Sequence, residues 1–503
     1  MKTINSSAKP VINYRKFWNK FPFVGFNLKV LEERRVPWYE AAEDTIKNMQ
    51  FGNVAIISGT SSGKTIMAIL ASYFHKRVLF VTSMRVLTVQ HAHLYEKIIG
   101  SRDGVQVLNG GFASDKRNWS NCKMTFATPE VLVNDFIDKK VKIDDYDLII
   151  LDEFDLGVGN HAIANVARIA KLKQVQLLCL SATLGDKKTE EEIMVTCAIK
   201  AIVQPLIPTP EKYEYLHLQP LTPHLKQIDE IFKCMMVSDA EHLKSYLPKE
   251  PKSDVFLQRE LKMIYNKIKA LPREQPFYDS MNIYARYYKL LHAYRICLTE
   301  SYEVFQDYVM KLQDDDKKAA EQILTDKRFH AIQELVQEDS LLHPKIAGLK
   351  LLMDTIKSND FSGIVFIRQK DTARHLKEYF DRTHFIKTEL YLGGRKNKAD
   401  RAKDEETLAK LSSKEIHAVF TTVLDRGLDS KADMVIQYSM PRKKAGRIQS
   451  AGRAGRFGTG YVYYICLDHP LDKGYYFATN TKRKKKAKKK VYFFQKNAQL
   501  SLF

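Results

Sequence analysis

The residues with the clearest chemistry stand near the two ends of the chain. Near the start, small and hydroxyl side chains lead to a lysine and a threonine: Ser58, Gly59, Thr60, Ser61, Ser62, Gly63, Lys64 and Thr65. Small residues let backbone N–H groups approach phosphate oxygens, and the apolar residues 66–70 predict a helix whose N-terminus favours negative charge. We expect Lys64 to reach the β- and γ-phosphates of a nucleoside triphosphate and Thr65 to bind Mg²⁺. The alternative is an ordinary Gly/Ser turn.

Two acids follow a buried strand-like run further along. The apolar residues 148–151 precede Asp152 and Glu153. A carboxylate at the end of such a strand can hold Mg²⁺, so we assign this role to Asp152. Glu153 beside it is placed to orient or deprotonate an attacking water. Taken alone, an acidic strand end is often a solvated loop, but behind a phosphate loop it favours nucleotide chemistry.

A glutamine and two arginines near the C-terminal end complete the candidate catalytic set. Gln449 precedes Arg453 and Arg456, which are three residues apart and would share one face of a helix. An arginine delivered to the γ-phosphate accelerates hydrolysis by about 10³–10⁵. A basic surface helix is the alternative, but it leaves the small residues Gly452 and Gly455 before each arginine unexplained.

Composition restricts the class of protein. The chain has 503 residues, enough for two to four domains, with a net charge of +21 that indicates a polyanionic partner such as nucleic acid. Six scattered cysteines without a CxxC pair argue against a zinc site or a disulfide framework. The N-terminus lacks an apolar signal-peptide core, and no apolar run approaches the roughly 20 residues that span a bilayer. We expect a cytoplasmic location.

The alternation of short apolar runs and helix-like stretches predicts an α/β protein with two parallel-sheet domains and a mostly helical domain between them. Short continuous apolar runs, typical of strands buried on both faces, recur in two blocks. Between them lies a stretch with helical spacing. The predicted divisions are an N-terminal extension 1–36, an ATP-binding domain 37–207, a helical insert 208–345, a second domain 346–478 and a basic tail 479–503.

In this order the motifs resemble a superfamily 2 helicase or translocase across most of the chain. The resemblance implies that the two parallel-sheet domains are RecA-like. The resemblance implies that Arg85, Gly110, Gly111, Thr128, Pro129 and Thr421 contact nucleic acid, and that Ser181 and Thr183 couple hydrolysis to strand binding. It also implies that Gly427 and Asp429, in the motif that follows Thr421, contribute to the nucleotide site. ATP, with Mg²⁺, would lie in a cleft between Lys64 and Arg456.

A closer resemblance is to the archaeal Hef and FANCM branch, which remodels forked and branched DNA. The helical insert, the His343–Ile346 junction and the Asp472–Phe477 segment before a Lys/Arg run carry this resemblance. The chain departs from that branch in having Asp-Glu-Phe-Asp and Ser-Ala-Thr motifs. Glu40 also stands where an adenine-recognising glutamine is expected, and a glutamate can accept from adenine N6 but repels N7.

The tail and insert suggest further partners. Residues 482–490 hold eight Lys/Arg in nine positions, and we expect Lys484, Lys485 and Lys486 to contact phosphates rather than form only a solvated run. In the insert, residues 284–289 mix aromatic and basic side chains. We expect most of these aromatics to be core, with some exposed Tyr or Arg contacting a junction. The final segment resembles a sliding-clamp docking peptide, through Gln499, Leu500, Leu502 and Phe503.

These observations favour an ATP-dependent DNA helicase or translocase acting on forked, branched or single-stranded DNA. Two alternatives stay open. One is an RNA helicase or translocase of the RIG-I, Dicer or DEAD-box type. The other is a clamp-tethered, non-catalytic scaffold on branched DNA, against which the intact Lys64, Thr65, Asp152, Glu153 and Arg456 argue.

Overall fold

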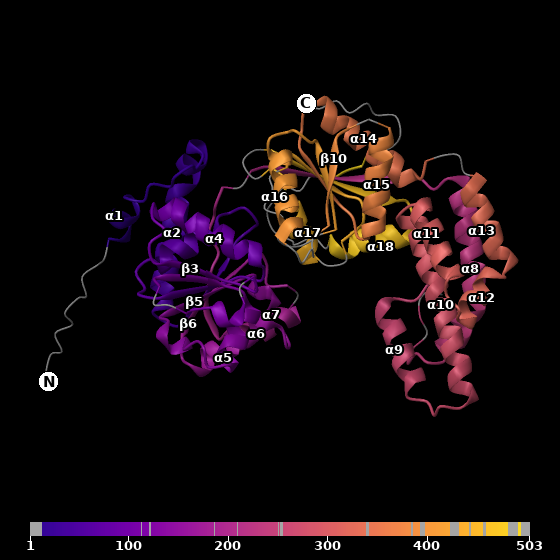
Figure 1. Cartoon of the computed structure of the whole chain (residues 1–503), viewed down its shortest axis with the longest axis horizontal. Helices are drawn as coiled ribbons and strands as arrows, with labels where there is room; N and C mark the ends of the chain where they lie inside the picture. Colours follow the sequence, from indigo (N-terminus) through magenta and orange to yellow (C-terminus); the bar gives the residue numbers. More distant parts are fainter. Residues whose placement is uncertain are drawn as a thin grey trace. The chain divides into compact units, whose positions relative to one another are not determined.

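The computed structural model describes residues 13–111, 113–119, 122–185, 187–208, 210–249, 251, 255–338, 342–383, 386–392, 398–422, 432–441, 444–455, 459–480 and 491–493. These residues fall into two compact units, one before Lys212 and one from Lys212 onward (Figure 1). Each unit is described by itself.

The first unit is built on a seven-stranded sheet in the order β3-β4-β2-β5-β6-β1-β7. Its strands are parallel. Buried apolar residues fill the central strands on both faces, which explains their continuous apolar sequences. The strands are β1 Asn53–Ile57, β2 Val78–Val81, β3 Val105–Leu108, β4 Met124–Ala127, β5 Leu148–Asp152, β6 Gln176–Ser181 and β7 Ile199–Val203.

Helices cover both faces of this sheet. Val54 and Ile56 of β1 contribute to a core shared with α2, α3 and α4, whereas Ala55 and Ile57 contribute to one shared with α5, α6 and α7. This alternation follows from the two-residue period of a strand. The helices are α1 Tyr14–Trp18, α2 Leu28–Met49, α3 Lys64–Ser72, α4 Arg85–Ile99, α5 Pro129–Ile137, α6 Ala162–Leu172 and α7 Lys187–Thr196.

The described part of the N-terminal segment belongs to this unit, so the predicted boundary at residues 36 and 37 is wrong. It falls inside α2, which runs on to Met49. Trp18 and Phe23 lie in the same apolar core as α2 and α3, and the Tyr39 hydroxyl donates to the Trp18 carbonyl at 2.8 Å. Large aromatic side chains stabilise a fold most when they are buried. The aromatic N-terminal sequence is therefore a cover for the first sheet.

The second unit contains another parallel sheet, in the order β10-β11-β9-β12-β13-β8-β14. Its strands are β8 Lys212–Gln219, β9 Gly363–Phe366, β10 Thr388–Tyr391, β11 Ala418–Thr421, β12 Met434–Gln437, β13 Gly460–Leu467 and β14 Val491–Phe493. The helices associated with it are α14 Pro344–Ser358, α15 Lys370–Arg382, α16 Lys398–Ser412, α17 Lys444–Ala451 and α18 Pro470–Thr479.

Strand β8 corrects the predicted start of the helical insert at residue 208. It pairs in parallel with β13 from Lys212 opposite Gly460 to Gln219 opposite Leu467. Tyr215 stacks on Tyr463 with ring centroids 4.8 Å apart. Because the two strands are far apart in sequence, no local sequence pattern indicates that they pair. The predicted end at residue 345 falls inside α14, and β14 lies within the predicted tail.

In the described residues between β8 and α14, six helices form the helical block, which shares the second unit with the sheet (Figure 1). One buried apolar cluster runs through the block and includes Leu467 of β13. The helices are α8 Pro223–Lys244, α9 Gln258–Lys269, α10 Gln275–Thr299, α11 Tyr302–Gln313, α12 Lys318–Leu324 and α13 Lys327–Glu338.

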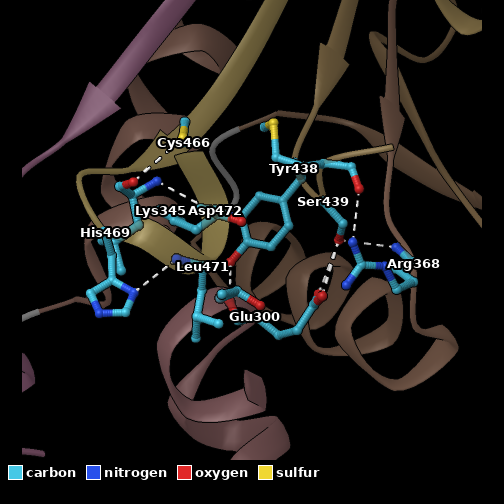
Figure 2. Close-up of polar contacts among 12 residues, drawn as sticks. Glu300, Lys345, Arg368, Tyr438, Ser439, Cys466, His469, Leu471 and Asp472 are labelled. Carbon is cyan, nitrogen blue, oxygen red and sulfur yellow. Dashed lines mark hydrogen bonds and ion pairs between the residues drawn. The ribbon is translucent and has the colours of Figure 1, made fainter. Parts of the chain in front are cut away.

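A buried polar network joins the helical block to the second sheet (Figure 2). Glu300, just after α10, accepts hydrogen bonds from the hydroxyls of Ser439 at 3.0 Å and Thr372 at 3.2 Å. The Tyr438 hydroxyl donates to the Glu300 carbonyl oxygen. Burial raises the pKa of the Glu300 carboxyl. These contacts hold the end of α10 against α15 and the segment that follows β12.

Lys345, at the start of α14, forms the second half of the network. Its Nζ lies 2.9 Å from Asp472 Oδ2, and both side chains are almost fully buried. Lys345 Nζ also lies 5.0 Å from the centroid of the Tyr438 ring. Asp472 accepts a further hydrogen bond from the Leu467 backbone N–H at 3.0 Å. The pair therefore connects α14, α18 and the end of β13.

His343 should make the stability of this junction depend on pH. Its Nδ1 accepts from Lys345 N–H at 3.3 Å, its Nε2 lies 3.2 Å from the Cys297 carbonyl oxygen, and burial lowers its pKa to about 3. Because the unfolded pKa is about 6.5, the neutral ring stabilises the fold above that value, and this contribution is lost as pH falls from about 6.5 toward 3. At pH 5 the loss is about 2 kcal/mol.

Urea unfolding at pH 7 and pH 5 measures this effect. His343 is the N-cap of α14, and asparagine keeps a capping side chain without a titratable ring. The fall in unfolding free energy between the two pH values should be about 2 kcal/mol smaller in His343→Asn than in the unsubstituted protein. An identical pH dependence for both proteins would contradict the assignment.

Candidate nucleotide and nucleic-acid site

The phosphate loop lies between β1 and α3, as the sequence predicts. Gly63 is the N-cap of α3 with φ +89°, and Ser61 has φ +63°. Lys64 Nζ donates to the carbonyl oxygens of Ser58 at 2.9 Å and Gly59 at 3.0 Å. The lysine thus folds back over its own loop at the N-terminus of a helix, where backbone N–H groups and the helix dipole favour an anion.

Helix α2 supports this loop through side chains that the sequence reading missed. Trp38 Nε1 donates to the Ser62 carbonyl oxygen at 2.7 Å, and Arg34 Nη1 donates to the Ser61 carbonyl oxygen at 3.0 Å. A Cβ at Gly63 would lie 2.5 Å from Trp38 Nε1, so glycine is required by both space and backbone conformation. The only sequence signal for this support was that Trp38 stands next to Tyr39 and Glu40, where the adenine-recognising residue was expected.

Glu40 lies on the exposed side of α2. Its Oε1 is 3.8 Å from Arg15 Nη2, and Arg15 also forms two hydrogen bonds with Glu43, at 3.0 and 3.1 Å. These contacts place Glu40 in a surface cluster of charges. Its role at the adenine stays a prediction.

The two acids stand at the carboxyl end of β5. Asp152 ends the strand, and Glu153 has a left-handed backbone with φ +53°. Ser83 Oγ donates to Glu153 Oε2 at 2.7 Å, and His91 Nε2 of α4 lies 3.1 Å from Asp152 Oδ2. Ser83 and His91 were not predicted. They come from the segment after β2, which lies next to β5 in the sheet, so only the strand order brings them to the acids.

The oxygen donors of Thr65 and Asp152 fit a nucleotide-bound Mg²⁺. Thr65 lies in the first turn of α3, and Asp152 ends a strand of the same sheet. Among the described residues no group of three or more His, Cys, Asp or Glu could hold a metal by itself. Mg²⁺ is commonly bound through one or two protein oxygens together with substrate phosphates, so this donor set is compatible with a metal that arrives with the nucleotide.

The predicted coupling residues lie between the acids and the phosphate loop. Ser181 Oγ is 2.8 Å from Asp155 Oδ1 and 2.7 Å from the Thr183 carbonyl oxygen. The Ser58 backbone N–H donates to the Ser181 carbonyl oxygen at 3.2 Å. Ser181 thus connects the segment that follows the two acids with the start of the phosphate loop.

The predicted nucleic-acid contacts of the first unit follow β2, β3 and β4, at the carboxyl edge of the sheet. Arg85 begins α4, Gly110 and Gly111 follow β3, and Thr128 and Pro129 begin α5. A Cβ at Gly110 would lie 2.4 Å from Arg85 Nη2, so this glycine leaves room for the arginine. Neighbouring parallel strands bring the three segments to one edge, where α/β sheets bind ligands.

The second unit corrects one geometric prediction. Gln449 lies on α17, but this helix ends at Ala451, and Arg453 lies in the turn that follows. Arg453 therefore does not lie on the helix that the sequence predicts for it, because the chain leaves the helix at Gly452 and reaches a positive φ of +57° at Gly455. Thr421 is buried at the end of β11. Several predicted site residues lie outside the described part of the chain: Arg456, Gly427, Asp429, Lys484, Lys485, Lys486, Gln499, Leu500, Leu502 and Phe503.

No helix in the described part of the chain has the length and apolar character needed to span a bilayer.

Two family models match the chain. Residues 39–192 match the DEAD/DEAH box helicase model, and residues 347–458 match the helicase conserved C-terminal domain. The crystal structure of the Pyrococcus furiosus Hef helicase domain is similar with a TM-score of 0.63 and 22% identity, covering 89% of this chain and 97% of that one. Saccharomyces cerevisiae Dbp5 bound to RNA and ADP BeF3 has a TM-score of 0.52 and 12% identity, covering 93% and 94%. These likenesses show the fold.

The curated relatives are longer proteins. A Methanocaldococcus jannaschii protein named as an ATP-dependent RNA helicase is 26% identical, over 84% of this chain and 56% of its own length. The ATP-dependent DNA helicase mph1 of Neurospora crassa is 20% identical over 84% and 40%, and the chicken (Gallus gallus) Fanconi anemia group M protein is 21% identical over 86% and 25%. The chain therefore spans between a quarter and somewhat over half of these relatives. With a DEAD/DEAH box helicase domain and a helicase conserved C-terminal domain, the chain belongs to the ATP-dependent helicases of superfamily 2, and its fold is similar to that of the Hef helicase domain.

Proposed function

We propose that this chain is an ATP-dependent DNA helicase or translocase that acts on forked or branched DNA. The observation that carries the motor assignment is the convergence of Lys64, Asp152, Glu153 and Ser181 at the carboxyl edge of the first sheet. The name of the Neurospora relative, an ATP-dependent DNA helicase, supports the DNA substrate. The role in fork repair or recombination rests on the resemblance of the motifs to the Hef and FANCM branch. The net charge of +21 supports a polyanionic partner.

In this proposal each candidate site residue has a defined role in ATP hydrolysis. Lys64 leaves its two loop carbonyls and contacts the β- and γ-phosphates, while Asp152 and Thr65 hold the nucleotide-bound Mg²⁺. Held by these two residues, Mg²⁺ would supply positive charge to neutralise the phosphates. Glu153, held by Ser83, orients the attacking water and accepts its proton. Gln449, Arg453 and Arg456 of the second unit stabilise charge on the γ-phosphate during transfer.

The RNA alternative has one specific support, since the Methanocaldococcus relative is named as an RNA helicase. Steady-state ATP hydrolysis separates the two. It should be measured without nucleic acid and with single-stranded DNA, forked DNA, a four-way junction and matched RNAs. We expect fork or junction DNA to stimulate hydrolysis more than linear DNA or any RNA does.

Each other outcome has a defined meaning. Stronger stimulation by RNA would replace the DNA assignment with the RNA alternative. Tight binding to branched DNA without hydrolysis on any substrate would leave the scaffold as the surviving function. Sliding-clamp docking through the C-terminal residues is a separate proposal, which binding of the full chain to a purified clamp, with and without residues 499–503, tests.

A further inference from the structure

A tyrosine-lined hollow in the helical block includes Tyr284 and Tyr288, which belong to the mixed aromatic and basic stretch at residues 284–289. It is about 370 Å³ in volume and lies among α9, α10 and α11. We call this pocket the tyrosine hollow. Its walls include Tyr265, Tyr284, Tyr288, Tyr308, Met281 and His292. The volume is at the lower end of the range for small-molecule sites, about 300–1,000 Å³.

The tyrosine rings of the hollow pack against one another but remain partly exposed to solvent. Tyr284 stacks on Tyr288 with ring centroids 6.1 Å apart and an interplanar angle of 25°, and it packs against Tyr265 at 5.6 Å. Tyr265 is 38% exposed and Tyr288 is 46% exposed. Rings that served only the core of the block would be buried, as Tyr287 and Tyr294 of the same helix are.

Cations border the aromatic walls. Lys262 and Lys269 are exposed and lie three and four residues from Tyr265, so the three side chains share one face of α9. Lys269 Nζ lies 6.0 Å from the centroid of the Tyr265 ring. His292 in the wall has a pKa lowered by burial and then by the charges of Arg295 and Lys311. The hollow therefore combines aromatic faces with positive charge at its border.

A ligand with a flat aromatic ring and a nearby anionic group would contact both the aromatic walls and the lysines at the border. Single-stranded nucleic acids bind in this way, because bases stack on aromatic side chains while phosphates contact basic residues. An apolar side chain of a protein partner would use the walls but not Lys262 and Lys269. We propose that the tyrosine hollow receives an unstacked nucleobase from a single-stranded arm, with the adjoining phosphates along Lys262 and Lys269. This inference rests on the proposed function and gives the helical block a specific contact in it.

Substitution at Tyr288 tests the stacking. The full chain should be titrated with a fork carrying a single-stranded DNA arm and with the same fork carrying an RNA arm. Since stacking of one base contributes about 1–3 kcal/mol, Tyr288→Leu should weaken binding about 5- to 150-fold on whichever arm is the ligand. Tyr288→Phe keeps the ring and should bind within about twofold of the unsubstituted protein.

Tyr278→Leu is the matched control. Tyr278 lies on the same helix and is 56% exposed, but it does not line the hollow. It should leave affinity unchanged, and thermal unfolding of all three variants checks that the block is folded. If Tyr278→Leu and Tyr288→Leu lost affinity equally, a general effect of α10 would replace the proposal.

An abasic arm identifies the occupant as a base. Without bases the unsubstituted protein should bind as weakly as Tyr288→Leu does, and Tyr288→Leu should lose nothing further, because both changes remove one interaction. Normal fork binding by Tyr288→Leu would contradict base binding in the tyrosine hollow but would leave the proposed helicase function in place. Failure of the unsubstituted protein to bind any fork would overturn both.

Discussion

Lys64→Ala should reduce ATP hydrolysis about 10²- to 10³-fold while leaving DNA binding largely intact. The lysine begins α3 and lies over the Ser58 and Gly59 carbonyl oxygens, where a bound β- or γ-phosphate would replace them. Removing one such preorganised donor costs a factor of this size in related catalytic sites. DNA contacts are predicted elsewhere on the first unit, at Arg85 and Thr128. Steady-state hydrolysis and fork binding, measured on the same preparation, give both quantities.

Glu153→Gln separates nucleotide binding from the chemical step. A glutamine can still accept from the Ser83 hydroxyl, now 2.7 Å from the glutamate, but it cannot accept a proton from water. Hydrolysis should fall about 10²- to 10⁴-fold while ATP binding is retained. Lys64→Ala should instead weaken ATP binding as well.

Lys171→Ala is the control for both variants, because Lys171 is an exposed lysine on α6 of the same unit. It should leave turnover unchanged. Normal turnover in Lys64→Ala would remove the phosphate-loop assignment, and normal turnover in Glu153→Gln would remove the assignment of Glu153 to the attacking water.

Lys345→Met should lower the free energy of unfolding by about 3–5 kcal/mol. The substitution leaves the Asp472 carboxylate buried without its cation, where Lys345 Nζ now lies 2.9 Å away. Breaking a buried pair is costly because the remaining charge keeps its desolvation penalty. Urea unfolding of the full chain, monitored by circular dichroism, measures the change.

Two further variants show whether buried charge is the cause. Lys345→Met combined with Asp472→Asn removes both charges but keeps an acceptor for the Leu467 N–H, and it should recover most of the loss. Lys473→Met breaks the more exposed pair with Asp468, at 2.6 Å, and should cost about 1 kcal/mol or less. Equal losses for Lys345→Met and Lys473→Met would contradict a special role for burial.

Local sequence patterns predicted the elements that carry the nucleotide chemistry. The run Val54–Ile57, the small-residue loop and the following apolar helix lie consecutively in the chain, so one short window contains strand, loop and helix. Asp152 and Glu153 are likewise fixed at the end of β5 by their position after an apolar run. Such motifs are readable because the interactions that define them are local in sequence.

Features that depend on distant pairing were missed. The sequence pattern placed β8 in the helical insert, yet the strand lies between β13 and β14 in the second sheet. His91 and Ser83 reach the acids only because β2 and β5 are neighbours, and Trp38 reaches the phosphate loop only because α2 packs on α3. In each case the partner is chosen by sheet order or helix packing, which no short window contains.

The sequence by itself therefore determined the helicase class of this protein and predicted which residues form its nucleotide site. The tertiary structure decided what supports them: the aromatic cover from the N-terminal segment, the Glu300 and Lys345 network beneath the helical block, and the exposure of the tyrosine hollow. The physical reason is that motifs record contacts between chain neighbours, whereas burial depends on which distant segments remove a side chain from water.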